Sequence, residues 1–197
     1  EWQVVDDIRE HMLYFLENHD EQRIASDFFC GNAMKAIPAA AMSLFFQKNP
    51  FMLYSGQEFG EKGMDKEGFS GRDGRTTIFD YWSPSTLAHA YQDSADETLT
   101  AEQKYLAATY RQLLRLANEE KALREGDTFD LMYVNPGSEG FDPRTNFAFL
   151  RKKDNEVMLI VLNFAQEARQ LQVCIPGHAF DFFQIKEEEV LVTELFS

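Results

Sequence analysis

Residues Met12–Ser26 read MLYFLENHDEQRIAS, and the change of character inside this stretch decides the fold. Leu13–Leu16 is a continuous apolar run, which is typical of a strand covered on both faces in a parallel sheet. The run leads directly into four polar residues, Glu17–Asp20. Because reactive groups in parallel α/β proteins sit just past the carboxyl ends of the strands, this junction is a candidate functional site.

The same design returns after one helical stretch. Residues 32–49 (NAMKAIPAAAMSLFFQKN) are rich in Ala, Met and Leu, and Asn32 is placed as a candidate N-cap for a helix near residues 33–48. Phe51–Tyr54 is a second apolar run, followed by Gly56, Gln57 and Glu58. Strand, helix and strand in this order predict a βαβ unit with parallel strands, so both polar clusters should meet at one edge.

The remaining chain divides into a loop-like stretch, a long helix and a β-rich part. Residues 60–98 have loop composition, and Thr100 with Gln103 forms a capping signal for a helix over 101–118. After Gly126, short β-rich runs separated by turn residues predict an antiparallel β domain. These runs are residues 128–134, 146–152, 156–164 and 169–175.

The charge balance limits the class of partner. The 197 residues carry 33 Asp and Glu against 19 Lys and Arg, which gives a net charge of −14. Most of the surface therefore repels a polyanion, and nucleic acid and anionic membranes are poor partners. The balance suits a neutral ligand such as a sugar as well as a cationic one.

No targeting or membrane segment is expected in this chain. The longest apolar run, Ala36–Phe46, is interrupted by Pro38 and is shorter than the ~18 residues that span a bilayer. The start at Glu1 has neither the basic region nor the apolar region of a signal peptide. We therefore expect a soluble chain that is either a processed product or a piece of a longer one. Its compartment is unknown. Cys30 and Cys174 are expected to be free and buried.

Four stretches resemble the α-amylase family of glycoside hydrolases, in the family's order. FLENHDEQRIAS (residues 15–26) resembles its seventh-strand motif, in which Asn-His-Asp ends a strand of a TIM barrel, and PFMLYSGQEFGE (residues 50–61) resembles its eighth-strand motif. LLRLANEEKALREG (residues 113–126) resembles its last barrel helix, and FAFLRKKDNEVMLIVLNF (residues 147–164) resembles strands of its C-terminal β domain. One departure is Phe51, which stands where the family usually has Pro.

The resemblance implies a fold of α/β plus all-β class. Residues 1–118 would form the C-terminal portion, about the last two β/α units, of a catalytic TIM (β/α)8 barrel. Because a whole barrel takes ~250 residues, this portion is roughly its last quarter. Residues 119–197 would form an antiparallel β-sandwich domain, which we expect to be truncated.

The chemistry implied is retaining cleavage of α-glucosidic bonds in starch-like glucans or maltooligosaccharides. By this resemblance Asp20 holds the hydroxyls of the reacting sugar and stabilises the transition state, and His19 donates to the same ring. Asn18, Arg23 and Glu58 are expected to support these two residues. The family's nucleophilic Asp and acid/base Glu come from earlier strands that this chain lacks, so we expect a C-terminal fragment that is inactive by itself.

Several alternatives stay open at this point. The parent protein could be a non-catalytic relative that binds glycans or another protein, or a related transglycosylase or isomerase acting on α-glucosides. From the residues alone, His19 and Asp20 could equally cap the following helix or pair with Arg23.

We expect no metal and no cofactor in this chain. The loop Met64–Gly74 has acidic residues and glycines but lacks the alternating oxygen ligands of a calcium-binding loop, so Ca²⁺ is an open question only for the parent protein. Loss of neighbouring strands would leave an apolar edge at Leu13–Leu16, which favours self-association of the isolated chain.

Overall fold

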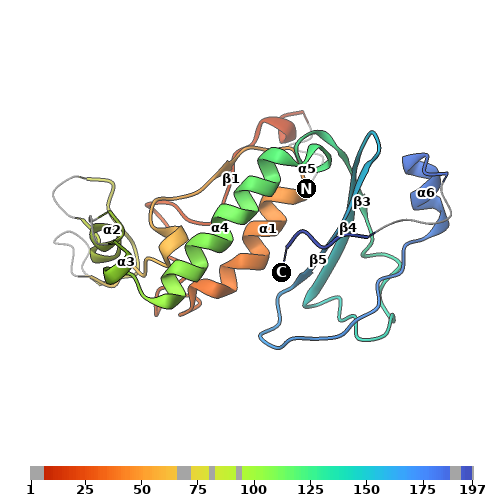
Figure 1. The fold of residues 1–197 in the computed structure, drawn as a ribbon. Coiled ribbons are helices and arrows are strands. Elements are labelled where there is room, and N and C mark those ends of the chain that lie inside the picture. Colours follow the sequence, from red (N-terminus) through yellow and green to blue (C-terminus); the bar gives the residue numbers. More distant parts are fainter. Residues whose placement is uncertain (1–6, 66–71, 80–82, 92–94, 187–191, 197) are drawn as a thin grey trace. The chain divides into compact units, whose positions relative to one another are not determined.

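The structure is a computed structural model that describes residues 7–65, 72–79, 83–91, 95–186 and 192–196 (Figure 1). It divides into two compact units, which are described separately here. Unit 1 comprises Glu1–Leu44 and Asn49–Arg115, and unit 2 comprises Phe45–Lys48 and Leu116–Ser197. The boundary between them falls inside the longest helix, α4.

Unit 1 contains the two short strands and most of the helices. Its elements are η2 (Arg9–His11), β1 (Tyr14–Phe15), η3 (Ala33–Ala36), α1 (Ile37–Phe45), β2 (Phe51–Met52), η4 (Gln57–Phe59), α2 (Ser85–Ala90), α3 (Ala95–Thr98) and the greater part of α4 (Ala101–Glu119). Unit 2 contains α5 (Lys121–Glu125), β3 (Asp127–Asp130), β4 (Asn146–Lys153), β5 (Glu156–Asn163) and α6 (Gly177–Phe183).

The predicted βαβ unit is confirmed. Strands β1 and β2 pair in parallel, with Tyr14 opposite Phe51, and the helical segment η3–α1 connects them. Asn32 is the expected cap, because its Oδ1 accepts a hydrogen bond from the backbone N–H of Met34 at 2.8 Å. Parallel pairing brings the residues that follow the two strands to the same edge of the sheet.

The expectation that the first strand is buried on both faces is wrong. Leu13 and Phe15 are exposed, and β1 has β2 as its neighbour in a two-stranded sheet. An apolar run has the same sequence whether the strand has a neighbouring strand on both sides or on one side. The sequence pattern therefore could not distinguish the two cases.

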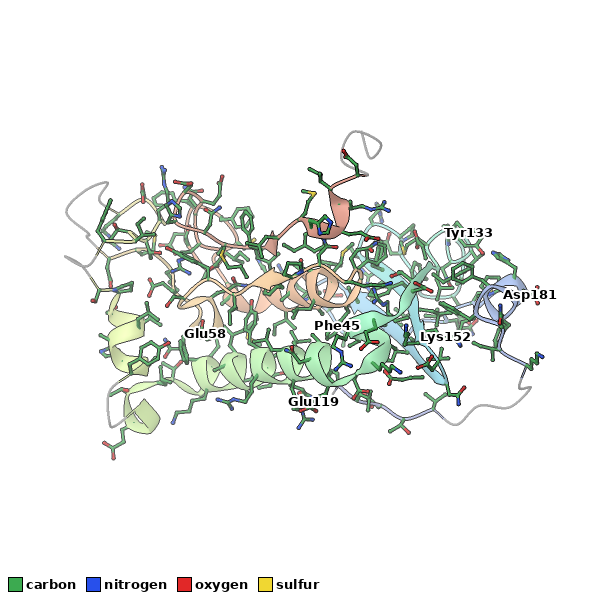
Figure 2. All side chains as sticks on the ribbon, turned by 90° about the horizontal axis from the view of Figure 1, so that it is seen from above. Phe45, Glu58, Glu119, Tyr133, Lys152 and Asp181 are labelled. Atoms are coloured by element: carbon green, nitrogen blue, oxygen red, sulfur yellow. The ribbon has the colours of Figure 1, made fainter. Side chains whose placement is uncertain are left out.

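Helix α4 begins and ends close to its predicted bounds. The Thr100 hydroxyl accepts from the N–H of Gln103 at 3.2 Å, and the Gln103 side chain accepts from the N–H of Thr100 at 2.9 Å. Leu106, Tyr110 and Leu113 are buried on one face, at the three- and four-residue spacing of an amphipathic helix. Figures 1 and 2 both show α1 and α4 lying side by side.

Residues 60–98 are less loop-like than predicted. The described part of this stretch contains the short helices α2 and α3, of which α2 also contacts η4. Helices of four to six residues are too short to show a helical repeat of apolar positions, so their sequence resembles that of a loop. Part of the loop Met64–Gly74 lies outside the described residues.

Unit 2 is built on the antiparallel sheet β3-β4-β5. Asp127 lies opposite Lys152, and Leu150 lies opposite Leu159. Alternate residues of β4 face opposite sides, so Ala148 and Leu150 pack against Ala179 and Phe183 of α6. Arg151 points to the other face, where it hydrogen bonds to carbonyl oxygens of α5.

The fourth predicted β run, residues 169–175, is not a strand. Its apolar residues Leu171, Val173 and Ile175 do alternate and pack partly buried against the core of unit 2. The backbone N–H of Cys174, however, donates to the side-chain oxygen of Asn135 at 2.7 Å instead of to a neighbouring strand. This alternation also leaves Cys174 exposed, and Cys30 is only partly buried, so both thiols are free as predicted but neither is buried.

Among the described residues, no helix combines the length and the apolar character that a membrane crossing requires.

Candidate functional site

The polar turn after β1 is organised by Asn18. Its side-chain oxygen accepts two hydrogen bonds, from the backbone N–H groups of Asp20 and Glu21, both at 2.9 Å. This is a local turn that an Asn side chain makes readily. It fixes the backbone that carries His19 and Asp20.

His19 and Asp20 lie together on the surface of this turn. The imidazole Nε2 is 3.4 Å from the Asp20 carboxylate, and the two side chains are 47% and 75% exposed. Asp20 therefore neither caps a helix nor pairs with Arg23. Both groups are open to a ligand and could hydrogen bond to sugar hydroxyls.

Arg23 lies buried behind this turn and joins the ends of both strands. Its guanidinium donates to the Glu17 carboxylate at 2.7 Å and to the carbonyl oxygen of Ser55 at 2.7 Å. Glu17 follows the first apolar run and Ser55 follows the second, so one side chain bridges the two. It also contacts the Thr76 hydroxyl at 2.8 and 3.0 Å, and we call Glu17, Arg23, Ser55 and Thr76 the Arg23 clamp.

A distant loop completes the Arg23 clamp and requires a glycine to do so. The carbonyl oxygen of Gly74 accepts from the N–H of Arg23 at 2.6 Å, which brings Thr76 to the guanidinium. Gly74 has a φ of +86°, and a Cβ placed there would lie 2.6 Å from the hydroxyl oxygen of Ser26. Any other residue at this position would push the loop away from the Arg23 clamp.

Glu17 is the important residue that the sequence reasoning did not assign. Its carboxylate accepts from Arg23 and from the backbone N–H of Ile24, at 2.7 and 2.8 Å, and it is 2% exposed. Burial raises the pKa of Glu17, and the positive charge of Arg23 opposes that rise. The sequence feature that could have indicated this role is a carboxylate at the end of an apolar run, with an arginine six residues later.

Glu58 takes part in a different arrangement. Its carboxylate accepts from the N–H of Gly56 at 3.1 Å, and it lines a cleft of about 310 Å³ together with Leu53 and Tyr110. Figure 2 labels Glu58 in this region. The buried amide of neighbouring Gln57 donates to the Tyr110 hydroxyl at 2.8 Å, and burial raises the pKa of Tyr110 to about 12. The structure thus brings His19 and Asp20 together, buries Arg23 among Glu17, Ser55 and Thr76, and gives Glu58 a separate contact with the Gly56 backbone.

The described residues contain no group of three or more His, Cys, Asp or Glu side chains arranged to hold a metal ion. The candidate site consists of His19, Asp20 and the Arg23 clamp.

Comparison with known proteins gives related sequences and folds, although no family model matches the chain. The chain is 31% identical to the α-amylase SusG of Bacteroides thetaiotaomicron over 163 residues, which is 79% of this chain and 23% of SusG. A variant of the trehalulose synthase MutB matches with a TM-score of 0.50 and 20% identity, over 84% of this chain and 38% of MutB. A maltogenic α-amylase of Thermotoga neapolitana matches with a TM-score of 0.45 and 16% identity, over 83% of this chain and 32% of that enzyme.

The chain thus spans about a quarter of the length of the curated relative it matches. The sequence match to SusG supports the resemblance of this chain to the α-amylase family of glycoside hydrolases, and the match to MutB shows a shared fold.

Proposed function

We propose that this chain is the part of an α-glucoside-active enzyme that supplies its transition-state-stabilising carboxylate, Asp20. The parent protein would cleave α-glucosidic bonds of starch-like glucans or maltooligosaccharides by a retaining mechanism. The observation that carries the proposal is the 31% identity to an α-amylase over most of the chain. The exposed His19–Asp20 pair beyond β1 gives that relationship a chemical basis.

In this proposal residues 1–118 are the C-terminal part of the catalytic barrel and residues 119–197 are the C-terminal β domain. The parallel pairing of β1 and β2 supports the first assignment, and the antiparallel sheet β3-β4-β5 supports the second. Polar residues beyond the carboxyl ends of parallel strands would then contribute to the active-site face of the barrel.

Asp20 would act on the sugar whose glycosidic bond is broken. In retaining hydrolysis a nucleophile and an acid/base, about 5 Å apart, carry the bond changes, and both would come from elsewhere in the parent protein. Hydrogen bonds from the ring hydroxyls to the Asp20 carboxylate would strengthen as positive charge develops on the ring. His19 would donate to the same sugar, and its contact with Asp20 holds the two groups side by side.

The supporting residues would hold the backbone of the turns after the two strands in position. Asn18 fixes the turn through its two accepted N–H groups, and Arg23 ties that turn to the end of the second strand through Ser55. Glu58 would support the neighbouring turn through the N–H of Gly56. We add Glu17 to this set, because it anchors the Arg23 guanidinium.

The direct test is to replace Asp20 in an active protein that contains this chain. Asp20→Asn should lower kcat on maltooligosaccharides at least a hundredfold, because losing one charged hydrogen bond in the transition state costs ~3 kcal/mol or more. Asp27→Asn is a matched control, since Asp27 is also exposed and lies on the same segment. Near wild-type turnover of Asp20→Asn, measured by release of reducing ends, would remove Asp20 from the mechanism.

The isolated 197-residue chain should release no reducing ends from starch. Transition-state stabilisation accelerates nothing when the nucleophile and the acid/base are absent. Activity that copurifies with the chain and disappears in Asp20→Asn would show that the catalytic pair lies within these residues.

A further inference from the structure

A cleft of about 400 Å³ lies within unit 2, which is in the size range of pockets that hold small ligands. One side is formed by the end of the β3–β4 pair, where Asp127 lies opposite Lys152. The other side is formed by Phe182 and Gln184 at the end of α6. We call this feature the α6 cleft, and Figure 2 labels Lys152, which lines it, and Asp181 on α6.

The α6 cleft has an aromatic wall. Phe182 is 56% exposed, although its ring packs against Phe183 at 5.0 Å and Phe129 at 5.5 Å between ring centroids. Phe183 is buried in the core of unit 2, and Phe129 also makes an edge-to-face contact with His178. The Phe182 ring is therefore held in place with one part open to solvent. Such a ring suits the apolar C–H face of a flat ligand.

The polar side of the α6 cleft is charged but balanced. Asp127, Asp154, Lys152 and Lys153 contribute two negative and two positive charges, in a protein whose net charge is −14. Both carboxylates already have a lysine partner: Asp127 contacts Lys48 at 3.3 Å, and Asp154 pairs with Lys121. An anion would be repelled by these two carboxylates. A purely apolar ligand would remove water from four charged groups, which is unfavourable.

Hydrogen-bonding groups of both kinds complete the lining. Lys152 lies on the face of β4 that carries Ala148 and Leu150 toward α6, so its ammonium can donate into the α6 cleft. The Gln184 backbone has a φ of +56° and its N–H donates to the Asp181 carbonyl, which fixes the backbone of Gln184 at the end of α6, where this residue lines the α6 cleft. A ligand that combines an apolar face with many neutral hydroxyl groups satisfies all of these features.

We propose that the α6 cleft binds one or more sugar residues of a neutral α-glucan, with a ring stacked on Phe182 and hydroxyls bound by Asp127, Lys152 and Gln184. The choice of an α-glucan over other neutral sugars rests on the proposed function. Binding at this cleft requires neither Asp20 nor a catalytic step, so unit 2 would hold polysaccharide independently of the chemistry.

The test is affinity electrophoresis of the full 197-residue chain in native gels cast with soluble starch. Wild type should be retarded relative to a gel without polysaccharide, and Phe182→Ala should raise the apparent Kd about fivefold or more. Tyr105→Ala is the matched control, because Tyr105 is an equally exposed ring on α4, and it should migrate as wild type does. Phe182→Trp should keep or strengthen binding, and circular dichroism should show that each variant is folded.

Two results would overturn the proposal. One is equal retardation of wild type and folded Phe182→Ala, and the other is retardation by hydroxyethyl cellulose but not by starch. Asp20→Asn separates this proposal from the catalytic one, because it should leave retardation unchanged while abolishing turnover in an active protein that contains the chain. Loss of retardation in Asp20→Asn would contradict the independence of the two.

Discussion

Unit 1 and unit 2 each bury an arginine, and the two side chains have different partners. Arg23 in unit 1 is 1% exposed and donates to the carboxylate of Glu17. Arg151 in unit 2 is 0% exposed, and the acceptors of its hydrogen bonds are neutral oxygens. These are the carbonyl oxygens of Phe46, Ala122, Leu123 and Gly126 and the hydroxyl of Thr128, at 2.8 to 3.2 Å.

The different partners correspond to different roles. Ala122 and Leu123 belong to α5, so Arg151 satisfies carbonyl groups at the end of that helix and attaches it to the sheet. Burial lowers the pKa of Arg151 to about 10, and the negative charge of Asp127 opposes that change. Arg23 instead joins the ends of two parallel strands beside the exposed Asp20. We infer that Arg151 serves folding alone, whereas Arg23 also positions the candidate site.

Arg151→Met should give the largest loss of stability. It removes the Arg151 donor from the carbonyl groups of Leu123 and Gly126, whereas those of Phe46 and Ala122 keep a second donor. Each carbonyl left without a donor costs ~1–3 kcal/mol, so the free energy of unfolding should fall by about 4 kcal/mol. Urea unfolding and hydrogen exchange of the β4 amides would measure the change. Arg144→Met is the control, because Arg144 is 86% exposed and should lose less than about 0.5 kcal/mol. Equal effects of the two substitutions would contradict the role given to Arg151.

Arg23→Met should cost about 3 kcal/mol near pH 8 and clearly less near pH 5. In the wild type, burial raises the pKa of Glu17 and the positive charge of Arg23 partly offsets that rise. Without Arg23 the buried carboxylate has no cationic partner, so its pKa is higher than in the wild type. A carboxyl with a raised pKa keeps its proton in the folded state where the unfolded chain has lost it. Stability therefore falls as the pH rises through that window.

The same pH series separates the two arginines. Arg151→Met leaves neutral oxygens behind, so its loss of stability should be the same at both pH values. If the cost of Arg23→Met also proved independent of pH, the unpaired Glu17 carboxylate would not be its source.

The sequence predicted those parts of the fold that depend on local patterns. Two continuous apolar runs around a helical stretch were enough to predict the parallel pair, and Thr100 with Gln103 marked the start of α4. The sequence patterns gave a wrong prediction where a side chain, instead of a neighbouring strand, forms the hydrogen bonds to the backbone. Residues 169–175 alternate like a strand, but Asn135 binds the backbone of Cys174, and no sequence pattern shows that substitution.

The candidate site was predictable only in part for a similar reason. Asn18, His19 and Asp20 are consecutive, so their proximity follows from the sequence itself. The Arg23 clamp depends on Ser55 and Thr76, which are distant in the chain and meet Arg23 only after folding. Helix α6 was missed because its seven residues are too few for a visible helical repeat.

The smallest expected effect concerns Tyr110, which reports on the charge of Glu17. Burial, and to a lesser extent the negative charge of Glu17, raise the pKa of Tyr110 to about 12. In the unfolded chain the tyrosine has its ordinary pKa of 10.0, so stability should fall as the pH rises between these two values. Glu17→Gln should lower the Tyr110 pKa slightly in an ultraviolet titration, with Tyr110→Phe identifying the signal. No change in that titration would mean that Glu17 is uncharged in the folded chain.

The central claim is that Arg23 positions Asp20 whereas Arg151 only stabilises the fold. The most direct test compares Arg23→Lys and Arg151→Lys in an active protein that contains this chain, with kcat on maltooligosaccharides expressed per folded molecule. Lys keeps the charge but cannot reach Glu17, Ser55 and Thr76 together, so Arg23→Lys should lower kcat about tenfold or more while KM changes little. Arg151→Lys should lose stability and keep the wild-type kcat. Equal kcat values for the two folded variants would contradict the claim.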